Sequence, residues 1–282
     1  MDQKKSFFAS LDSKSALIVG LVAGILVICT IGFLVMLGLY FKGNSSSLSG
    51  NFSPVANADQ EDQPSQPSVP VSVTKSDRPK VELFVMSYCP FGLQMEKAYL
   101  PAWNLLKDKA DIGIKFVSYA MHGLKEIEEN TRQLCIGQNQ PAKLPAYLQC
   151  FTGKDDYKSC MSQVGITEGS LSSCVNATNA KYKILDKFND QTTWLSGRYP
   201  VYPVHEDLNN KYGVQGSPTL VINGAQVDGV NRTAEAVKQA ICAAFNNPPA
   251  ECGTTLATAA YGAGFGYDAS GNPAAGAECA TN

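Results

Sequence analysis

The sequence has few histidines, little excess charge and no closely spaced pair of cysteines. Its 282 residues include two histidines and carry a formal net charge of −2. That charge offers no basic face for nucleic acid. Without a Cys-x-x-Cys pair, a structural zinc site has little to build on. We therefore expect no nucleic-acid partner and no metal, and nothing in the sequence calls for an organic cofactor.

What the chain does have is an ordinary globular composition and many cysteines. It is 44% hydrophobic and 17% charged, and its length suits one or two domains. Cys29 lies in an apolar segment, and the other eight cysteines all follow it. They are Cys89, Cys135, Cys150, Cys160, Cys174, Cys242, Cys252 and Cys279. So many thiols indicate an oxidising compartment outside the cytosol, where they form disulfides.

Residues 16–41 contain no charged side chain. As a helix they would extend roughly 39 Å, enough to cross the hydrocarbon core of a membrane. Lys4, Lys5 and Lys14 precede the segment, and after Lys42 no base follows until residue 75. The positive-inside rule then predicts a single-pass cell-membrane protein, with residues 1–15 in the cytoplasm and the rest outside.

The alternative to an uncleaved anchor is a signal peptide cut near Ala56-Asn57-Ala58. We favour the anchor, because the apolar run is too long for a signal peptide and ends well before that site. Residues 42–79 are rich in Ser, Pro, Gln and Asn and are expected to form a flexible linker.

Beyond the linker, the hydrophobic pattern predicts a strand at 80–88, a helix at 91–109 and a second strand at 111–120. A strand, a helix and a strand in so short a stretch form a right-handed βαβ unit with parallel strands.

The pattern then becomes helical from 123 to about 190. A β-hairpin follows, with its turn at Asn223-Gly224, and residues 231–247 read as a closing amphipathic helix. The Gly/Ala-rich residues 253–282 are expected to be disordered.

Two short motifs at the ends of these elements carry a family resemblance. Ser-Tyr-Cys-Pro-Phe-Gly at 87–92 resembles the active-site turn of DsbA-like thioredoxin-fold thiol:disulfide oxidoreductases, and Gly-Ser-Pro-Thr at 216–219 resembles their cis-proline loop. The cysteine-bearing helical region resembles that of gamma-interferon-inducible lysosomal thiol reductases. The resemblance covers about 80–250. It implies an α/β, thioredoxin-like domain at 80–252 with an inserted, disulfide-bonded helical subdomain.

Cys89 is the candidate nucleophile. We expect it at the N-cap of the 91–109 helix, with Pro90 at the first helical position. The unpaired N–H groups and partial positive charge of a helix N-terminus can lower a thiol pKa to about 3.5–7.5 and so favour the reactive thiolate. The alternative is a cysteine buried as a small hydrophobic residue.

Five further residues are expected to serve substrate binding or proton handling. The resemblance implies a cis Ser217–Pro218 bond beside Cys89, which leaves residue 217 to bind an extended substrate strand; otherwise Pro218 only opens an edge strand. Tyr88 and Phe91 flank the thiol and shape a peptide groove. His122 follows the second strand, so it either tunes Cys89 or is a solvated loop residue.

Gly92 occupies the position at which the resembled Cys-x-x-Cys motif has its second cysteine. A lone Cys89 can attack a disulfide but cannot release itself locally. The sequence therefore predicts one-thiol exchange, such as disulfide isomerisation, on exported proteins that carry thiols or disulfides. Release would come from the substrate, a small thiol or a redox partner. The alternatives are a non-catalytic, chaperone-like module that holds peptides and, less favoured, a glutaredoxin-like site.

The remaining cysteines are expected to form structural disulfides. Cys242 and Cys252 flank a Pro-Pro turn and are predicted to pair. Four cysteines in successive helical segments allow three connectivities. Of these we favour Cys150–Cys160 with Cys135–Cys174. Cys279 is left in the tail, either as an unpaired thiol or as a resolving cysteine for Cys89.

Overall fold

The structure is a computed structural model that describes residues 26, 29, 30, 33 and 73–267. The chain divides into two units, Met1–Ser65 and Gln66–Asn282, and residues 73–267 belong to the second. The predicted membrane span at 16–41 falls almost wholly outside the described residues, as does the predicted linker up to residue 72. The prediction of a flexible linker is wrong for its last residues, 73–79, because Ser76 pairs with Phe245 and its N–H donates to the carbonyl oxygen of Ala244 (2.8 Å). Within the described part of the chain, no helix is both long and apolar enough to cross a bilayer.

The centre of the second unit is a four-stranded sheet with the order β2-β1-β3-β4. Strand β1 (Lys80–Val85) pairs in parallel with β2 (Asp111–Phe116), and helix α2 (Pro90–Leu106) connects them. This confirms the predicted βαβ unit, although both strands end earlier than the sequence pattern suggested. On its other side, β1 pairs antiparallel with β3 (Thr219–Ile222).

The predicted hairpin joins β3 to β4 (Ala225–Gln226). Its two turn residues, Asn223 and Gly224, have φ angles of 50° and 84°. Left-handed values at both positions belong to the tight turn that Asn-Gly favours. The closing helix is α9 (Ala234–Ala243), shorter than the predicted 231–247.

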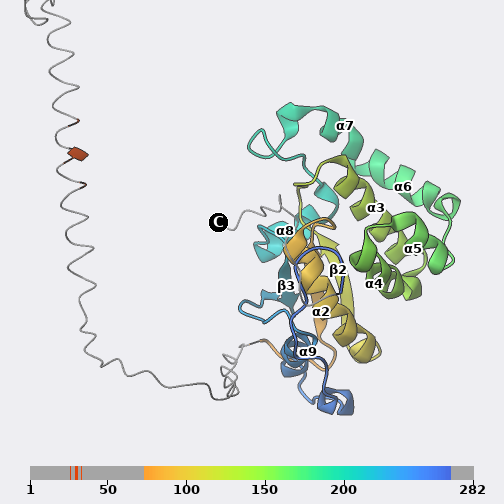
Figure 1. Cartoon of the computed structure of the whole chain (residues 1–282), viewed down its shortest axis with the longest axis vertical. Helices are drawn as coiled ribbons and strands as arrows, with labels where there is room; N and C mark the ends of the chain where they lie inside the picture. Colours follow the sequence, from red (N-terminus) through yellow and green to blue (C-terminus); the bar gives the residue numbers. More distant parts are fainter. Residues whose placement is uncertain (1–25, 27–28, 31–32, 34–72, 268–282) are drawn as a thin grey trace, which may run out of the picture. The chain divides into compact units, whose positions relative to one another are not determined.

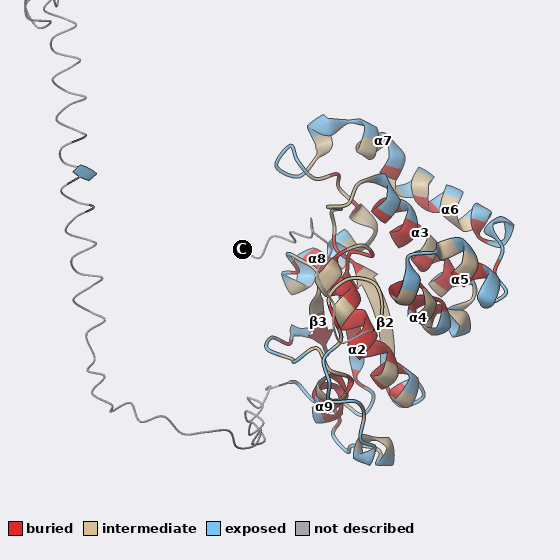
Figure 2. Cartoon of the chain, in the orientation of Figure 1, coloured by how far each residue is buried: buried red, intermediate tan, exposed pale blue. Residues whose placement is uncertain are grey.

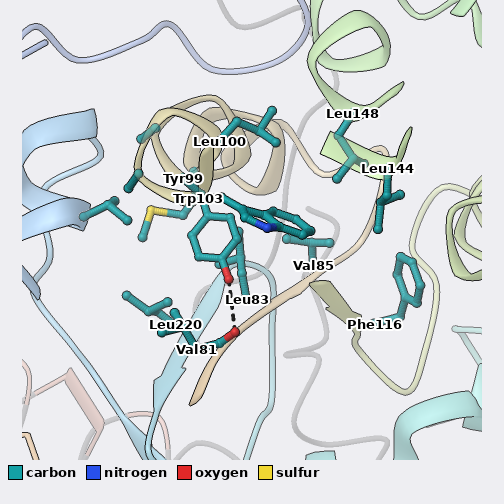
Figure 3. Packing of buried hydrophobic residues seen from close by; sticks show 14 of the residues in the cluster. Val81, Leu83, Val85, Tyr99, Leu100, Trp103, Phe116, Leu144, Leu148 and Leu220 are labelled. Atoms are coloured by element: carbon teal, nitrogen blue, oxygen red, sulfur yellow. Dashed lines mark hydrogen bonds between the residues drawn. The ribbon is translucent and has the colours of Figure 1, made fainter. Parts of the chain in front are cut away.

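Residues of β1 alternate between two buried clusters, one on each face of the sheet. Val81, Leu83 and Val85 join the larger cluster, in which Tyr99 and Trp103 of α2 lie over the strands (Figure 3). The Tyr99 hydroxyl group lies 3.2 Å from the carbonyl oxygen of Val81. Helix α2 packs between α9 and α4 and is one of the most buried elements of the fold (Figure 2).

Helices α3 to α7 lie between β2 and β3 in the chain and gather on one side of the sheet (Figure 1). They are α3 (Leu124–Asn139), α4 (Leu144–Lys154), α5 (Tyr157–Gln163), α6 (Glu168–Tyr182) and α7 (Ile184–Asn189). Helix α8 (Glu206–Tyr212) follows and packs with its Leu208 and Tyr212 against the smaller cluster.

Three disulfides join the cysteines that were expected to be structural. Cys135–Cys174 links α3 to α6, Cys150–Cys160 links α4 to α5, and Cys242–Cys252 ties α9 to the segment after it. All three predicted pairings are confirmed. The domain thus has an α/β, thioredoxin-like architecture with a disulfide-bonded helical insert.

The prediction of a disordered tail from residue 253 is wrong for residues 254–267, which we call the C-terminal strap. The buried ammonium group of Lys97 donates hydrogen bonds to the carbonyl oxygens of Gly262, Gly264 and Gly266, at 2.8, 2.8 and 2.5 Å. The ring of Phe265 packs 5.3 Å from that of Phe151 in α4. Aromatic anchors and a buried cation thus order a segment whose glycine content suggested disorder. Residues 268–282 lie outside the described part.

Candidate functional site

Cys89 occupies the N-cap of α2, and Pro90 is the first helical residue, as predicted. The backbone N–H of Cys89 donates to the carbonyl oxygen of Met86 (2.9 Å), and the carbonyl oxygen of Cys89 accepts from the N–H of Leu93 (2.8 Å). Helix α2, which is described in full, has no acidic residue in its first turn. Its N-terminal N–H groups and partial positive charge therefore act on the sulfur without an opposing carboxylate in that turn.

The Ser217–Pro218 bond is cis, as the resemblance implied, and it lies beside Cys89. The Sγ atom of Cys89 is 3.4 Å from the carbonyl oxygen of Ser217. The hydroxyl group of Ser217 accepts a hydrogen bond from the backbone N–H of Met86 (2.9 Å). Two segments far apart in sequence therefore meet at the carboxyl end of β1, which places the motifs at 87–92 and 216–219 in one site.

The structure shows what fills the space of the missing second cysteine. A Cβ atom placed on Gly92 would lie 2.6 Å from the Oγ atom of Ser217 and 3.2 Å from the carbonyl oxygen of Met86. The first distance is far below van der Waals contact. A side chain at position 92 and the serine hydroxyl group therefore compete for the same volume.

Cys89 itself is disulfide-bonded and fully buried in this structure. It belongs to the smaller cluster on the sheet, with Phe84, Met86, Val117 and Val221 among its members. The structure thus represents an oxidised form in which the sulfur is covered. The tail cysteine, Cys279, lies outside the described residues, so both roles considered for it remain predictions.

Tyr88, which precedes Cys89 in the turn, packs against both the insert and the C-terminal strap. Tyr88 contacts Phe151 of the insert and Phe265 of the C-terminal strap, each with ring centroids 5.7 Å apart. Burial, together with a hydrogen bond to Asp155, raises the pKa of Tyr88 above its usual value. Tyr88 is thus held by the insert and the strap, and its predicted contact with substrate remains a prediction.

A cationic side chain lies over the ring of Tyr88 and another over the ring of Phe91, and the sequence predicted neither contact. The ammonium group of Lys125 lies 4.1 Å from the ring centroid of Tyr88, and the guanidinium group of Arg232 lies 4.9 Å from that of Phe91. Arg232 also donates a hydrogen bond to Gln94 (2.8 Å). Lys125 and Arg232 are distant in sequence from Cys89, and no local sequence motif predicts their contacts with these rings.

His122 is bound to a buried carboxylate. Its Nδ1 atom lies 2.5 Å from Oε2 of Glu126, which also accepts a hydrogen bond from the backbone N–H of Tyr88 (3.3 Å). The other carboxylate oxygen accepts from the backbone N–H of Met121 (2.8 Å). Glu126 therefore links the loop after β2 to the turn that carries Cys89. His122 contacts Glu126, and Glu126 in turn contacts that turn.

Two further buried carboxyl groups lie between α2 and the insert. Both side-chain oxygens of Glu96 lack a hydrogen-bond partner among the described residues, and burial, helped by the charge of Glu129, raises the pKa of Glu96 to about 8. Burial also raises the pKa of Glu129, which accepts a hydrogen bond from Tyr147 (2.7 Å). A protonated Glu96 avoids placing an unpaired charge in the core.

Several solved structures of bacterial thiol–disulfide oxidoreductases are similar to this chain. The reduced disulfide bond oxidoreductase DsbG from Mycobacterium tuberculosis is 14% identical, with a TM-score of 0.44 over 65% of this chain and 88% of that one. The reduced DsbA of the same organism is 13% identical, with a TM-score of 0.43 over 65% and 93%. For oxidised BdbD from Bacillus subtilis the values are 17%, 0.39, 64% and 94%.

No protein-family model matches the chain, and no curated protein does either. The TM-scores of these three solved structures all lie below 0.5.

Proposed function

We propose that the protein is a membrane-anchored, extracytoplasmic thiol–disulfide exchange enzyme in which Cys89 is the nucleophile. The observation that carries the proposal is the meeting of Cys89, at the N-terminus of α2, with the cis Ser217–Pro218 bond, where Sγ lies 3.4 Å from the carbonyl oxygen of Ser217. A helix N-terminus favours a thiolate, and a backbone segment next to the sulfur can hold an extended substrate chain.

In the proposed reaction, the thiolate of Cys89 attacks one sulfur of a substrate disulfide. A bond forms between Cys89 and that sulfur, and the other substrate sulfur leaves as a thiolate. Pro90 starts the helix without needing a hydrogen bond, while Phe91 and Tyr88 border the turn. Gly92 leaves room for the Ser217 hydroxyl group, which fixes the proline loop against Met86. His122 acts through Glu126, which holds this turn in place.

Exported proteins with thiols or disulfides are the proposed substrates, since residues 16–41 would hold the domain at the outer face of the cell membrane. We also propose that the helical insert is similar to that of gamma-interferon-inducible lysosomal thiol reductases. A redox partner or a small thiol resets the enzyme between turnovers.

The test is disulfide isomerisation by the full chain in detergent, with a substrate protein whose disulfides have been scrambled. We expect the reduced chain to restore the native substrate and Cys89→Ser to lower the rate to background. Cys29→Ser, which removes the exposed free cysteine, is the matched control and should retain the rate. Full activity in Cys89→Ser would overturn the proposal. An inactive wild-type chain that still binds unfolded peptides would instead support the peptide-holding alternative.

A further inference from the structure

Four successive backbone N–H groups, those of residues 86–89, lead from the end of β1 to the start of α2. They lie past the last paired position of the strand, since β1 pairs with β2 up to Val85. The N–H of Cys89 donates to the carbonyl oxygen of Met86 within the turn (2.9 Å). The N–H of Met86 donates to the hydroxyl group of Ser217 (2.9 Å). Side chains from other segments thus begin to replace the neighbouring strand at this point.

The two N–H groups in the middle of this turn are bound by helix α3 of the insert. Asn130 accepts a hydrogen bond from the N–H of Ser87 through Oδ1 (3.1 Å), and Glu126 accepts one from the N–H of Tyr88 through Oε2 (3.3 Å). Asn130 and Glu126 are four residues apart in α3, so they lie one helical turn apart on the same face. Their spacing matches two consecutive amides of the turn.

The burial of Asn130 is not explained by packing alone. Its side chain is fully buried, as is Ser87, and its Nδ2 atom has no hydrogen-bond partner among the described residues. A buried amide with one unpaired end is less favourable than an apolar side chain, unless its other end is needed. The other end is needed here, because Oδ1 is the acceptor for the buried N–H of Ser87. An aspartate could also accept, but it would place a second carboxylate beside Glu126, close to a sulfur that has to ionise.

We propose that Asn130 is a positioning residue for Cys89, through which the helical insert holds the backbone of the reactive turn and sets the place of the sulfur at the N-terminus of α2. The inference rests on the proposed function. Glu126 alone holds the turn at one amide, whereas Asn130 adds a second point next to it and so fixes the direction of the backbone. Any shift at Ser87 is carried to Cys89, which lies two residues further along.

The C-terminal strap holds the neighbouring parts of the same turn. Phe265 packs against the ring of Tyr88, with ring centroids 5.7 Å apart. The N–H of Gly264 donates to the carbonyl oxygen of Pro90 (2.9 Å). These contacts restrain a side chain and the first residue of α2, while the backbone before them is held by the two side chains of α3.

The experiment compares variants of the full chain in detergent. Each carries Cys29→Ser and Cys279→Ser, which leaves Cys89 as the one cysteine outside the three described disulfides. The first quantity measured is the midpoint of the pH dependence of Cys89 alkylation by iodoacetamide. The second is the rate constant with which the Cys89 thiolate attacks a synthetic peptide that has one intramolecular disulfide, followed by mass spectrometry of the protein–peptide adduct.

Two substitutions of Asn130 separate the hydrogen bond from the charge. Asn130→Ala removes the acceptor of the Ser87 N–H, and the thiolate should then attack the peptide about three- to tenfold more slowly, the factor that corresponds to one typical hydrogen bond. Its alkylation midpoint should rise toward the value of about 8.5 for an ordinary thiol, because the sulfur is held less well at the helix N-terminus. Asn130→Asp keeps the acceptor and should retain the rate constant of the thiolate, while its carboxylate raises the midpoint.

Gln133→Ala is the matched control. Gln133 is a second buried amide of α3, its Oε1 atom also lacks a hydrogen-bond partner among the described residues, and its Nε2 atom donates to Glu129 (2.9 Å). The variant should leave both measured quantities unchanged, even where urea unfolding shows a less stable domain.

The possible failures can be told apart. Unchanged values in Asn130→Ala, or equal changes in Gln133→Ala, would overturn the positioning role. An Asn130→Asp variant as slow as Asn130→Ala would overturn it as well. If Asn130→Ala does not fold, Asn130→Asp decides, and an unchanged midpoint in that variant would contradict the proposal. A parent chain that forms no adduct with the peptide would contradict the proposed function itself, and the inference with it.

Discussion

Gly92 and Ser217 are predicted to be coupled, so that a side chain at position 92 is tolerated only when the serine hydroxyl group is removed. The Cβ atom of Gly92→Ala would lie 2.6 Å from Oγ of Ser217 and 3.3 Å from Cβ of Cys89. Overpacking of this kind typically costs about 1–3 kcal/mol. If the hydroxyl group rotates away, the N–H of Met86 loses its acceptor, at a cost of about 1–3 kcal/mol if the group stays buried.

Against these costs stands the better helix propensity of alanine, worth at most about 1 kcal/mol over glycine. We therefore expect Gly92→Ala to destabilise the domain by about 1–2 kcal/mol after this offset. In the Gly92→Ala/Ser217→Ala double variant the clash disappears, so the two changes together should cost less than the sum of the single changes, by about 1–3 kcal/mol.

The assay is urea unfolding of residues 66–282, the second unit of the chain, with its disulfides intact. Gly169→Ala is the matched control, because Gly169 also lies in the first turn of a helix, α6, and its added Cβ would meet no described atom within 4 Å. It should stabilise the domain slightly or leave it unchanged. A Gly92→Ala variant as stable as Gly169→Ala, or purely additive effects in the double variant, would refute the reasoning.

Three further predictions concern stability. Because the pKa of Glu96 is raised to about 8, the folded state holds a proton that the unfolded state releases above about pH 4.5. Stability should therefore fall as the pH rises from about 4.5 to 8, and Glu96→Gln should flatten that fall. Burial, aided by the nearby Lys115 charge, lowers the pKa of His205 to about 3, so its contribution is present above about pH 6.5 and is lost as the pH falls toward 3. His205→Phe should remove this acid-side loss, yet cost about 1–3 kcal/mol because the N–H of Phe116 loses its acceptor. Replacing both cysteines of Cys135–Cys174 by serine should cost about 4 kcal/mol, against about 3 kcal/mol for Cys150–Cys160, because sequence separations of 39 and 10 residues close loops of different length.

Urea unfolding at several pH values measures the first two of these predictions, and unfolding at neutral pH the third. A pH profile that Glu96→Gln or His205→Phe leaves unchanged would contradict the corresponding assignment. Equal losses for the two disulfides would show that loop length does not set their contributions.

The sequence predicted the parts of the fold that local patterns encode. The alternating β1 and the Asn223-Gly224 turn have direct signals in residue types, and the Cys150–Cys160 and Cys242–Cys252 pairings each join cysteines only 10 residues apart. The N-cap position of Cys89 also followed from Pro90, because proline without an N–H favours the first helical position. These features depend on residues near one another in the chain.

What the sequence did not predict depends on contacts over long distances or on unusual backbone conformations. Within the region from 123 to about 190 that the sequence predicted as helical, Lys183 has a φ of 51° and separates α6 from α7. A lysine gives no sign of such a break. The contact of Gly92 with Ser217 joins segments far apart in sequence, so the glycine looked only like a lost cysteine.

The order of the C-terminal strap was missed for a related reason. Its glycines and alanines dominate the composition, while its fixed position comes from Tyr261, Phe265 and Tyr267 and from the distant Lys97. The aromatic spacing in this Gly-rich segment was the one available signal. It is also the segment that connects the domain to Cys279.

The central claim is that Cys89 is a reactive thiol activated by the N-terminus of α2. The most direct measurement is the pH dependence of its alkylation by iodoacetamide, followed by mass spectrometry. The sample is the reduced second unit carrying Cys279→Ser, with Cys89→Ser as the control. We expect modification at Cys89 with a midpoint well below the value of about 8.5 for an ordinary thiol. A midpoint at or above that value, with slow modification, would contradict the enzymatic role and leave a fold that holds peptides without exchanging disulfides.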